Sequence, residues 1–155
     1  MKLRQIASHH YTVLAVLDPV AGNAVLATLG DAKRFHTSLF EQIMAALKDY
    51  TPTYGPPFAE NRRGVARAKR LYEGLSEFIA QNQSSSRRRR GRQTEDEKSL
   101  GLRVFFFEYG RHVICTNACY KTSPTPPEAI PAALRIRTDY FDALASGDVQ
   151  ILEED

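Results

Sequence analysis

The sequence has 155 residues, of which 43% are hydrophobic and 25% charged, and this is the composition of an ordinary globular protein. It contains no apolar run of about 18 residues, so it predicts no membrane-spanning helix and no membrane partner. We therefore expect one cytoplasmic domain over residues 1–155, long enough to bury about two thirds of its unfolded-chain surface.

The formal net charge is only +3, but the basic residues are concentrated in one part of the chain. Residues 62–92 contain ten arginines and lysines and two glutamates, which gives +8 for this stretch and leaves −5 for the rest. A local excess of this size attracts a polyanion such as a nucleic acid. The alternative is a solvated basic face that binds nothing.

The first half of the chain predicts a strand followed by helices. Residues 11–17 (YTVLAVL) are almost continuously apolar, which favours a strand covered on both faces, and the stretch before them, with His9-His10, leads into it. Residues 23–29 favour a short helix that Gly30 stops. Apolar residues at helical spacing predict a longer helix over residues 32–50, capped by Asp31 or Ser38 and ended by Thr51-Pro52.

The second half predicts three strands and a helix. Residues 70–79 favour a strand with Gly74 at a bulge. Residues 81–101 have no apolar pattern and carry a block of arginines followed by a block of acids, so we expect a mobile insertion there. Two β-branched and aromatic runs on either side of Gly110 predict a β-hairpin over residues 102–120.

The C-terminal segment predicts a helix over residues 126–145. A capping box at Thr125 would begin this helix, Pro131 would kink its start, and the acidic tail 147–155 would be frayed. Its predicted inner face consists of Ile130, Ala133, Leu134, Arg137, Phe141 and Leu144. The element order predicts an α+β fold, in which a mainly antiparallel sheet carries an N-terminal helix pair and a C-terminal helix on one face.

The two cysteines, Cys115 and Cys119, lie four residues apart on the second strand of the predicted hairpin. We expect them on the same face of that strand and too far apart for a disulfide. With His112 nearby, a zinc ion is conceivable, but no second pair of ligands has metal spacing. Free, buried thiols and a cytosolic compartment fit the pattern better, and no metal or other cofactor is expected.

Several motifs resemble the RelE/ParE toxin superfamily, most closely its HigB-like, phage-derived branch. The matching residues are Lys69-Arg70-Leu71, Gly74-Leu75, Glu77, Arg103-Val104, Phe107, Gly110-Arg111, Lys121-Thr122, Thr125-Pro126, Ala133-Leu134-Arg135, Arg137 and Tyr140. The likeness spans most of residues 11–144; it is loose before residue 69 and specific in about the last forty residues.

The resemblance implies the toxin of a type II toxin–antitoxin pair. Such a toxin would be a metal-independent endoribonuclease (an mRNA interferase) that cleaves mRNA, usually on the ribosome, and so blocks translation and arrests growth. Its partner would be a cognate antitoxin, expected to be a small helix-turn-helix protein. Two alternatives remain: a toxin of the same fold that inhibits DNA gyrase without cutting RNA, and a catalytically silent nucleic-acid-binding relative.

RNA can be cut by its own 2′-hydroxyl if a protein aligns the attack, moves two protons and stabilises the charge on the phosphorane. By resemblance, Arg103 would clamp the phosphate, Lys121 would contact it or carry a proton, and Tyr120 would stack on a base or donate its phenolic proton. The RNA-binding residues would be Lys69, Arg70, Arg87, Arg88, Arg89, Arg90, Arg92 and Arg111. From the residues alone, Arg103 could instead form a salt bridge with Glu77 on the adjacent strand.

Two positions depart from the family pattern. Ile79 stands where an arginine is common, and Pro124 stands where a lysine is common. Either the five arginines of the insertion supply the missing charge, or the nuclease is weakened.

Overall fold

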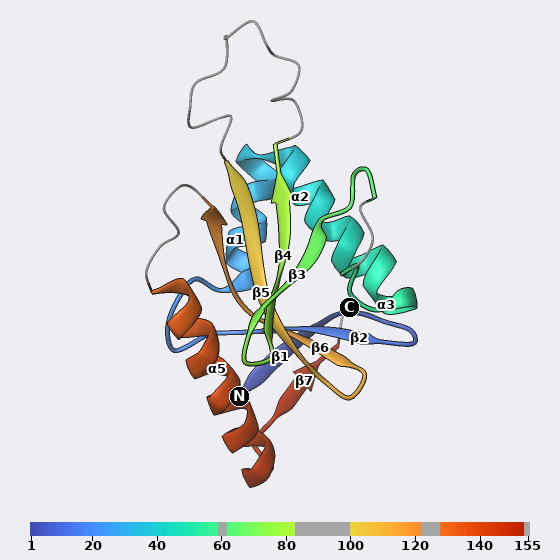
Figure 1. The fold of residues 1–155 in the computed structure, drawn as a ribbon. Coiled ribbons are helices and arrows are strands. Elements are labelled where there is room, and N and C mark those ends of the chain that lie inside the picture. The colour runs from blue at the N-terminus through green and yellow to red at the C-terminus, as the bar shows by residue number, and fades with distance from the viewer. Residues whose placement is uncertain (59–61, 83–99, 122–127, 154–155) are drawn as a thin grey trace, which may run out of the picture.

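The computed structural model describes residues 1–58, 62–82, 100–121 and 128–153 (Figure 1). The strands are β1 (Lys2–Ser8), β2 (Thr12–Val16), β3 (Arg67–Tyr72), β4 (Leu75–Gln81), β5 (Gly101–Tyr109), β6 (His112–Lys121) and β7 (Gln150–Leu152). The helices are α1 (Val25–Phe35), α2 (Thr37–Met44), α3 (Thr51–Tyr54) and α5 (Ala129–Ser146), and a π-helical segment, η1 (Ala45–Tyr50), joins α2 to α3.

The strands form a single seven-stranded sheet in the order β3-β4-β5-β6-β2-β1-β7. Four of the pairings between these strands are antiparallel, and the pairings of β2 with β6 and of β1 with β7 are parallel. The fold is therefore α+β, as the sequence predicts, but the sheet is larger and more mixed than expected.

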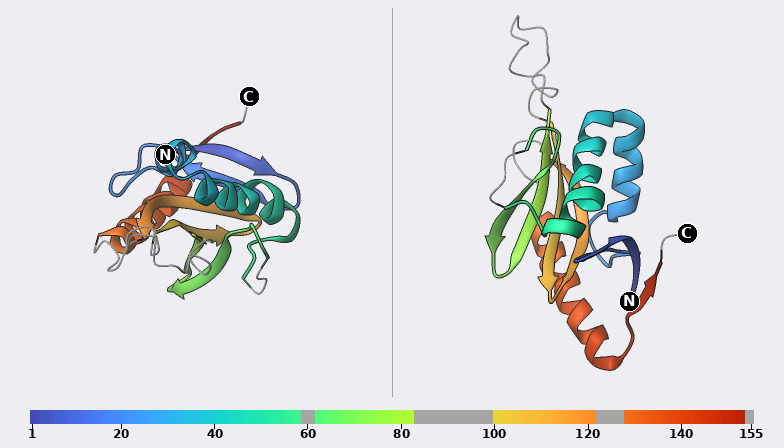
Figure 2. Two further views of the ribbon diagram at one scale, coloured as in Figure 1. Left: turned by 90° about the horizontal axis from the view of Figure 1, so that it is seen from above. Right: turned by 90° about the vertical axis from the view of Figure 1, so that its right-hand side faces the viewer.

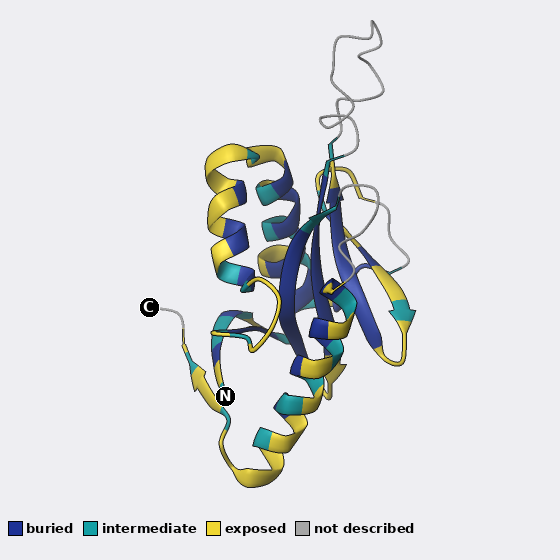
Figure 3. Cartoon of the chain, turned by 90° about the vertical axis from the view of Figure 1, so that its left-hand side faces the viewer, coloured by how far each residue is buried: buried dark blue, intermediate teal, exposed yellow. Residues whose placement is uncertain are grey.

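Helices cover both faces of the sheet, not one face as predicted (Figure 2). The helix pair α1–α2 and segment η1 pack on one face, where Ile43 and Phe106 belong to the same cluster. Helix α5 packs on the other face, where Ile136 contacts the cluster of Phe107. Successive side chains of a strand point to opposite faces, so a strand with a run of buried side chains on both faces, such as β5, needs cover on both sides. Figure 3 shows the buried strands between the two helical layers.

The N-terminal half differs from its prediction at three points. β1 and β2 form an antiparallel hairpin, with His9 and His10 in its turn and their rings stacked at 4.1 Å. Gly30 does not stop α1, which runs on to Phe35. The helical path also continues past Thr51 into α3, with Pro52 in the first turn of that helix.

Neither of the caps predicted for this helix is used. The N-cap position of α2 is His36, and no side-chain hydrogen bond from either Asp31 or Ser38 caps the helix start. The break at His36 divides the predicted helix into the separate helices α1 and α2.

Residues 67–81 form a β-hairpin, so the prediction of one bulged strand was wrong. Glu73 and Gly74 form the turn, with φ of 54° and 80°, and two left-handed residues are what a tight type I′ turn requires. The hairpin predicted around Gly110 is confirmed, with Tyr109 paired to His112 across its turn. The predicted mobile insertion lies outside the described residues, except at its ends, where the Asn82 amide donates to the Leu100 carbonyl at 3.3 Å.

Helix α5 begins at Ala129, and the predicted capping box at Thr125 lies outside the described residues. Pro131 is the third helical residue, where its missing N–H removes no intrahelical bond. The buried face consists of Ala129, Ala132, Ala133, Ile136 and Tyr140. Phe141 is 39% exposed, but its ring centre lies 5.5 Å from that of Phe107, so it faces the sheet as predicted; Leu144 is 37% exposed and does not belong to the buried face. The prediction was wrong for Leu144, and it was also wrong for the tail, because β7 pairs in parallel with β1.

A β-bulge separates the two cysteines. Val104 pairs with Ala118 and Phe106 with Cys115, so β6 has one residue more than β5 between these pairs. Cys115 therefore packs in the core under the helix pair, whereas Cys119 packs with Phe105 on the face of α5. Both thiols are free and buried, as predicted, but the expectation that they share a face was wrong.

Candidate nucleic-acid interface

Arg103 lies within β5 and is only 5% exposed. Its Nε donates a hydrogen bond to Oε1 of Glu77 on the neighbouring strand β4, and its guanidinium carbon lies 5.0 Å from the centre of the Phe105 ring. The salt bridge that the sequence offered as an alternative role is confirmed. A phosphate could reach this guanidinium only by competing with Glu77.

Tyr120 and Lys121 are neighbours in β6 and therefore point to opposite faces of the sheet. The Tyr120 ring lies on the side of the helix pair, where its hydroxyl donates to the Asp31 carboxylate at 2.5 Å and His36 meets it edge-on at 5.2 Å. Burial, and then the Asp31 carboxylate, raise the pKa of Tyr120 far above its ordinary value. The structure thus brings Lys121 onto the same face as Arg103 but places Tyr120 on the other.

Among the predicted RNA-binding residues that the structure describes, Lys69, Arg70 and Arg111 do not form one surface. Lys69 is exposed on β3, opposite Glu77 in the register. Arg70 points to the other face, where its guanidinium carbon lies 3.9 Å from the Phe58 ring centre and it pairs at 4.0 Å with Glu108.

Arg111 lies at the turn between β5 and β6, roughly 30 Å along β6 from Lys121. Arg87, Arg88, Arg89, Arg90 and Arg92 lie outside the described residues.

A basic pocket that the site prediction missed opens where β3 begins. It has a volume of about 450 Å³ and is lined by Gln42, Arg62, Arg63, Val65, Arg67, Ile79 and Gln81. No carboxylate is among its described lining residues. The Gln42 side chain joins α2 to β4 at this pocket, because its amide group donates to the main-chain carbonyl of Gln81 at 2.9 Å and accepts from the main-chain amide of Gln81 at 3.3 Å. We call this cavity the arginine pocket.

The arginine pocket and Lys121 flank the same glycine. Gln81 pairs with Gly101 and Gly101 pairs with Lys121, so these positions lie side by side at the end of the sheet. A Cβ on Gly101 would lie 3.5 Å from the Lys121 Cβ and 3.7 Å from the Gln81 Cγ. Three arginines and one lysine thus gather at the end of the sheet where the arginine-rich residues 83–99 leave β4 and return to β5.

The pocket also lies beside Ile79, the position at which the family that the sequence resembles commonly has an arginine. Arg67 pairs with Ile79 in the register, so a cation of the neighbouring strand lies beside that position. Arg62 and Arg63 were included in the basic stretch of the sequence, but no spacing signal marked them. The main-chain carbonyl of Gln42 accepts from the amide of Ala66 at 3.0 Å and so ties the segment after Arg63 to α2.

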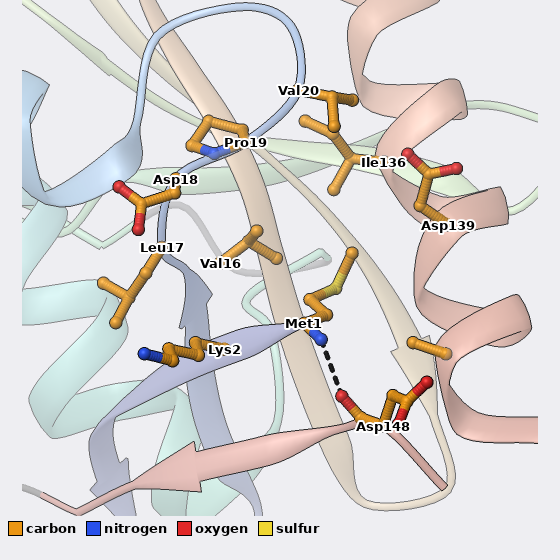
Figure 4. Close-up of a pocket in the computed structure, with 11 residues that line it drawn as sticks. Met1, Lys2, Val16, Leu17, Asp18, Pro19, Val20, Ile136, Asp139 and Asp148 are labelled. Atoms are coloured by element: carbon orange, nitrogen blue, oxygen red, sulfur yellow. Dashed lines mark hydrogen bonds between the residues drawn. The ribbon is translucent and has the colours of Figure 1, made fainter. Parts of the chain in front are cut away.

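A second cavity of about 430 Å³ lies between the start of β1, the loop after β2 and α5 (Figure 4). Val16, Val20 and Ile136 make part of its lining apolar, and the Met1 amino group donates to the carbonyl of Asp148 at 2.6 Å at one margin. It contains none of the predicted site residues.

In the described part of the chain, no three His, Cys, Asp or Glu side chains are close enough to hold a metal ion. No helix there is both long and apolar enough to cross a bilayer. No family model, curated protein or solved structure matches this chain.

Proposed function

We propose that this chain is the toxin of a type II toxin–antitoxin pair and acts as a metal-independent endoribonuclease on mRNA, cleaving it on the ribosome. The observation that carries the proposal is the cationic end of the sheet. There, Arg62, Arg63 and Arg67 line one pocket and Lys121 stands across Gly101 from it, with no carboxylate among the described lining residues. Clustered guanidinium and ammonium groups suit a phosphodiester backbone and the extra charge of its transition state.

Lys121 is the residue best placed to act on the scissile phosphate. It is partly exposed at the end of β6, whereas Arg103 is buried two residue pairs further into the sheet. A lysine there would act as a point charge on the phosphate oxygens or carry a proton during the attack of the 2′-hydroxyl. Arg103 would then act chiefly as a positioning residue, since its bond to Glu77 ties β5 to β4 beneath the site.

The proposal also agrees with the order of the elements. Strand β2, the helix pair, the hairpin β3–β4 and the hairpin β5–β6 follow one another in the order of the motifs on which the family resemblance rests, and β1 and β7 are additional to that pattern. An antitoxin of the pair would inhibit the toxin most directly by covering the cationic end with acidic side chains.

A catalytically silent nucleic-acid-binding protein is the second candidate. It is favoured by the fact that two of the three predicted catalytic side chains are bonded to carboxylates, Arg103 to Glu77 and Tyr120 to Asp31. Such a protein would use the same cationic end but would leave RNA intact.

Induced expression of the chain alone, with mapping of mRNA 5′ ends, separates these functions. The nuclease proposal expects growth arrest with new mRNA ends, both lost in Lys121→Ala and both retained in Arg135→Ala, a cation of α5 outside the site. Cleavage on ribosomes should persist when the purified protein is stripped of metal ions with a chelator before it is added to ribosomes in their own magnesium buffer. Arrest without new ends would favour a gyrase inhibitor, and neither arrest nor cleavage by a folded protein would favour the silent binding protein.

A further inference from the structure

Two tyrosines extend the arginine pocket along the helix that follows α2. The guanidinium carbon of Arg62 lies 5.3 Å from the centre of the Tyr50 ring, and the Tyr50 ring lies 4.9 Å from the Tyr54 ring. Arg62 also lines the pocket. The Tyr50 ring therefore contacts both the pocket's Arg62 and Tyr54.

Tyr54 contacts the Tyr50 ring but is exposed to solvent. Tyr50 and Tyr54 are four residues apart at the ends of η1 and α3, a spacing that places both on one side of the helical path. Gly55 ends that path with a φ of 83°, and a Cβ there would meet the Tyr11 ring at 3.1 Å. Tyr54 as a residue is nevertheless 67% exposed, although apolar ring surface is costly to leave in water.

Cations beside an exposed aromatic ring are the combination that binds single-stranded nucleic acid. The backbone phosphates follow the positive charge, and unpaired bases stack on aromatic side chains. A duplex offers the same phosphates, but its bases are already stacked and paired inside it. An exposed tyrosine therefore adds affinity only for a single strand.

We infer that the arginine pocket and the Tyr50–Tyr54 ring pair together bind single-stranded RNA, with a phosphate in the pocket and an unpaired base stacked on Tyr54. The choice of RNA as the polyanion rests on the proposed function. The site lies beside Lys121 but is separate from it, so it holds the strand rather than reacting with it. Arg62 connects its two parts, because it lines the pocket and contacts the Tyr50 ring.

The test is a fluorescence anisotropy titration of the full chain with labelled RNA of about a dozen nucleotides, single-stranded or annealed to its complement. The strands carry 2′-O-methyl groups, so that no 2′-hydroxyl is available for cleavage and binding alone is measured. The variants are Arg63→Ala/Arg67→Ala, Tyr54→Ala and Tyr54→Phe. The charge-matched control is Arg4→Ala/Arg135→Ala, two cations outside the pocket.

The arginine pair and the tyrosine should leave different signatures. Arg63→Ala/Arg67→Ala should weaken single-strand binding about tenfold or more. It should also reduce the slope of log affinity against log salt by about 0.7, because the pocket holds one phosphate and each phosphate neutralised on a single strand contributes about 0.7 to that slope. Tyr54→Ala should weaken binding roughly tenfold with an unchanged salt slope, and Tyr54→Phe should bind like the parent chain. The duplex should bind more weakly and should not respond to Tyr54→Ala.

Three results would overturn the inference. In the first, Tyr54→Ala weakens binding of duplex and of single strand equally. In the second, Tyr54→Ala leaves single-strand affinity unchanged. In the third, Arg63→Ala/Arg67→Ala loses no more affinity than the control pair. The 5′-end mapping tests the nuclease independently. If the parent chain cuts no mRNA but the binding pattern holds, the nuclease proposal fails and the RNA site stands. If it cuts mRNA and the three variants bind as it does, the RNA site alone fails.

Discussion

Arg103 and Glu77 form an ion pair in the interior of the protein, between neighbouring strands β5 and β4. Their side chains are only 6% and 2% exposed, so each charge has lost nearly all of its hydration and is compensated by the other. A resemblance to RNA-cleaving toxins assigns Arg103 to the phosphate, but the fold assigns it first to Glu77. The two roles lead to different expectations for mutants.

Glu77→Gln should lower the free energy of unfolding by about 3–5 kcal/mol, because it leaves a buried guanidinium without its counter-charge. Urea denaturation of the purified protein measures this loss. The double variant Glu77→Leu/Arg103→Met removes both charges and should recover most of it. A loss below about 1 kcal/mol in Glu77→Gln would contradict a structural role for the pair.

Tyr120 should remain protonated well into the alkaline range. Its pKa is raised in the folded protein by burial and by Asp31, whereas in the unfolded chain it titrates near 10. The unfolded chain therefore loses this proton first, so the stability contributed by Tyr120 is fully present below about pH 10 and is lost as the pH rises above it. Urea midpoints measured between about pH 8 and pH 11 should fall less steeply for Tyr120→Phe than for the parent chain.

The same substitution tests the catalytic role predicted for Tyr120. Because the ring faces the helix pair, away from Lys121, Tyr120→Phe should leave any mRNA cleavage within a few-fold of the parent level. A loss comparable to that of Lys121→Ala would instead show that the phenol takes part in the reaction. Asp31→Asn keeps a hydrogen-bond acceptor and serves as the matched control for the contact.

The cysteines should be unreactive in the folded protein. Burial raises the pKa of the Cys115 thiol far above its ordinary value and also raises that of Cys119, so neither forms the reactive thiolate at neutral pH. Ellman's reagent should react with both thiols when the protein is unfolded in denaturant. In the folded protein it should react promptly with neither. Mild oxidation should produce no intrachain disulfide, because the two side chains lie on opposite faces of the sheet. A disulfide formed under native conditions would contradict the bulge in β6.

Glu73→Asn should stabilise the protein. Glu73 has a φ of 54°, a left-handed conformation that costs most residues about 1 kcal/mol but suits asparagine before glycine in a type I′ turn. We expect a gain of about 0.5–1 kcal/mol in the free energy of unfolding. The bond that Arg137 donates to the carbonyl of residue 73 is retained, since it involves the main chain. Glu73→Gln removes the same charge without the turn preference, and an equal gain there would refute the explanation.

The sequence alone predicted the elements whose signal is local. One is the apolar run that forms β2, and the others are the two runs around Gly110 that form β5 and β6. Each is predicted by residues that lie within a few positions of one another. The turn at Glu73-Gly74 was misread as a bulge because its flanking residues look like one continuous strand. The tail was misread because the partner that orders β7 is β1, at the other end of the chain.

Only the tertiary structure decided which residues meet. One extra residue in β6 puts Cys115 and Cys119 on opposite faces, and the alternation of the strand separates Tyr120 from Lys121. The arginine pocket requires α2 and the ends of β3 and β4 to come together, which no spacing in the sequence records. The sequence determined the amount of positive charge and the strands that would carry it. Long-range packing and strand register determined where that charge gathers, because both depend on contacts between residues far apart in the chain.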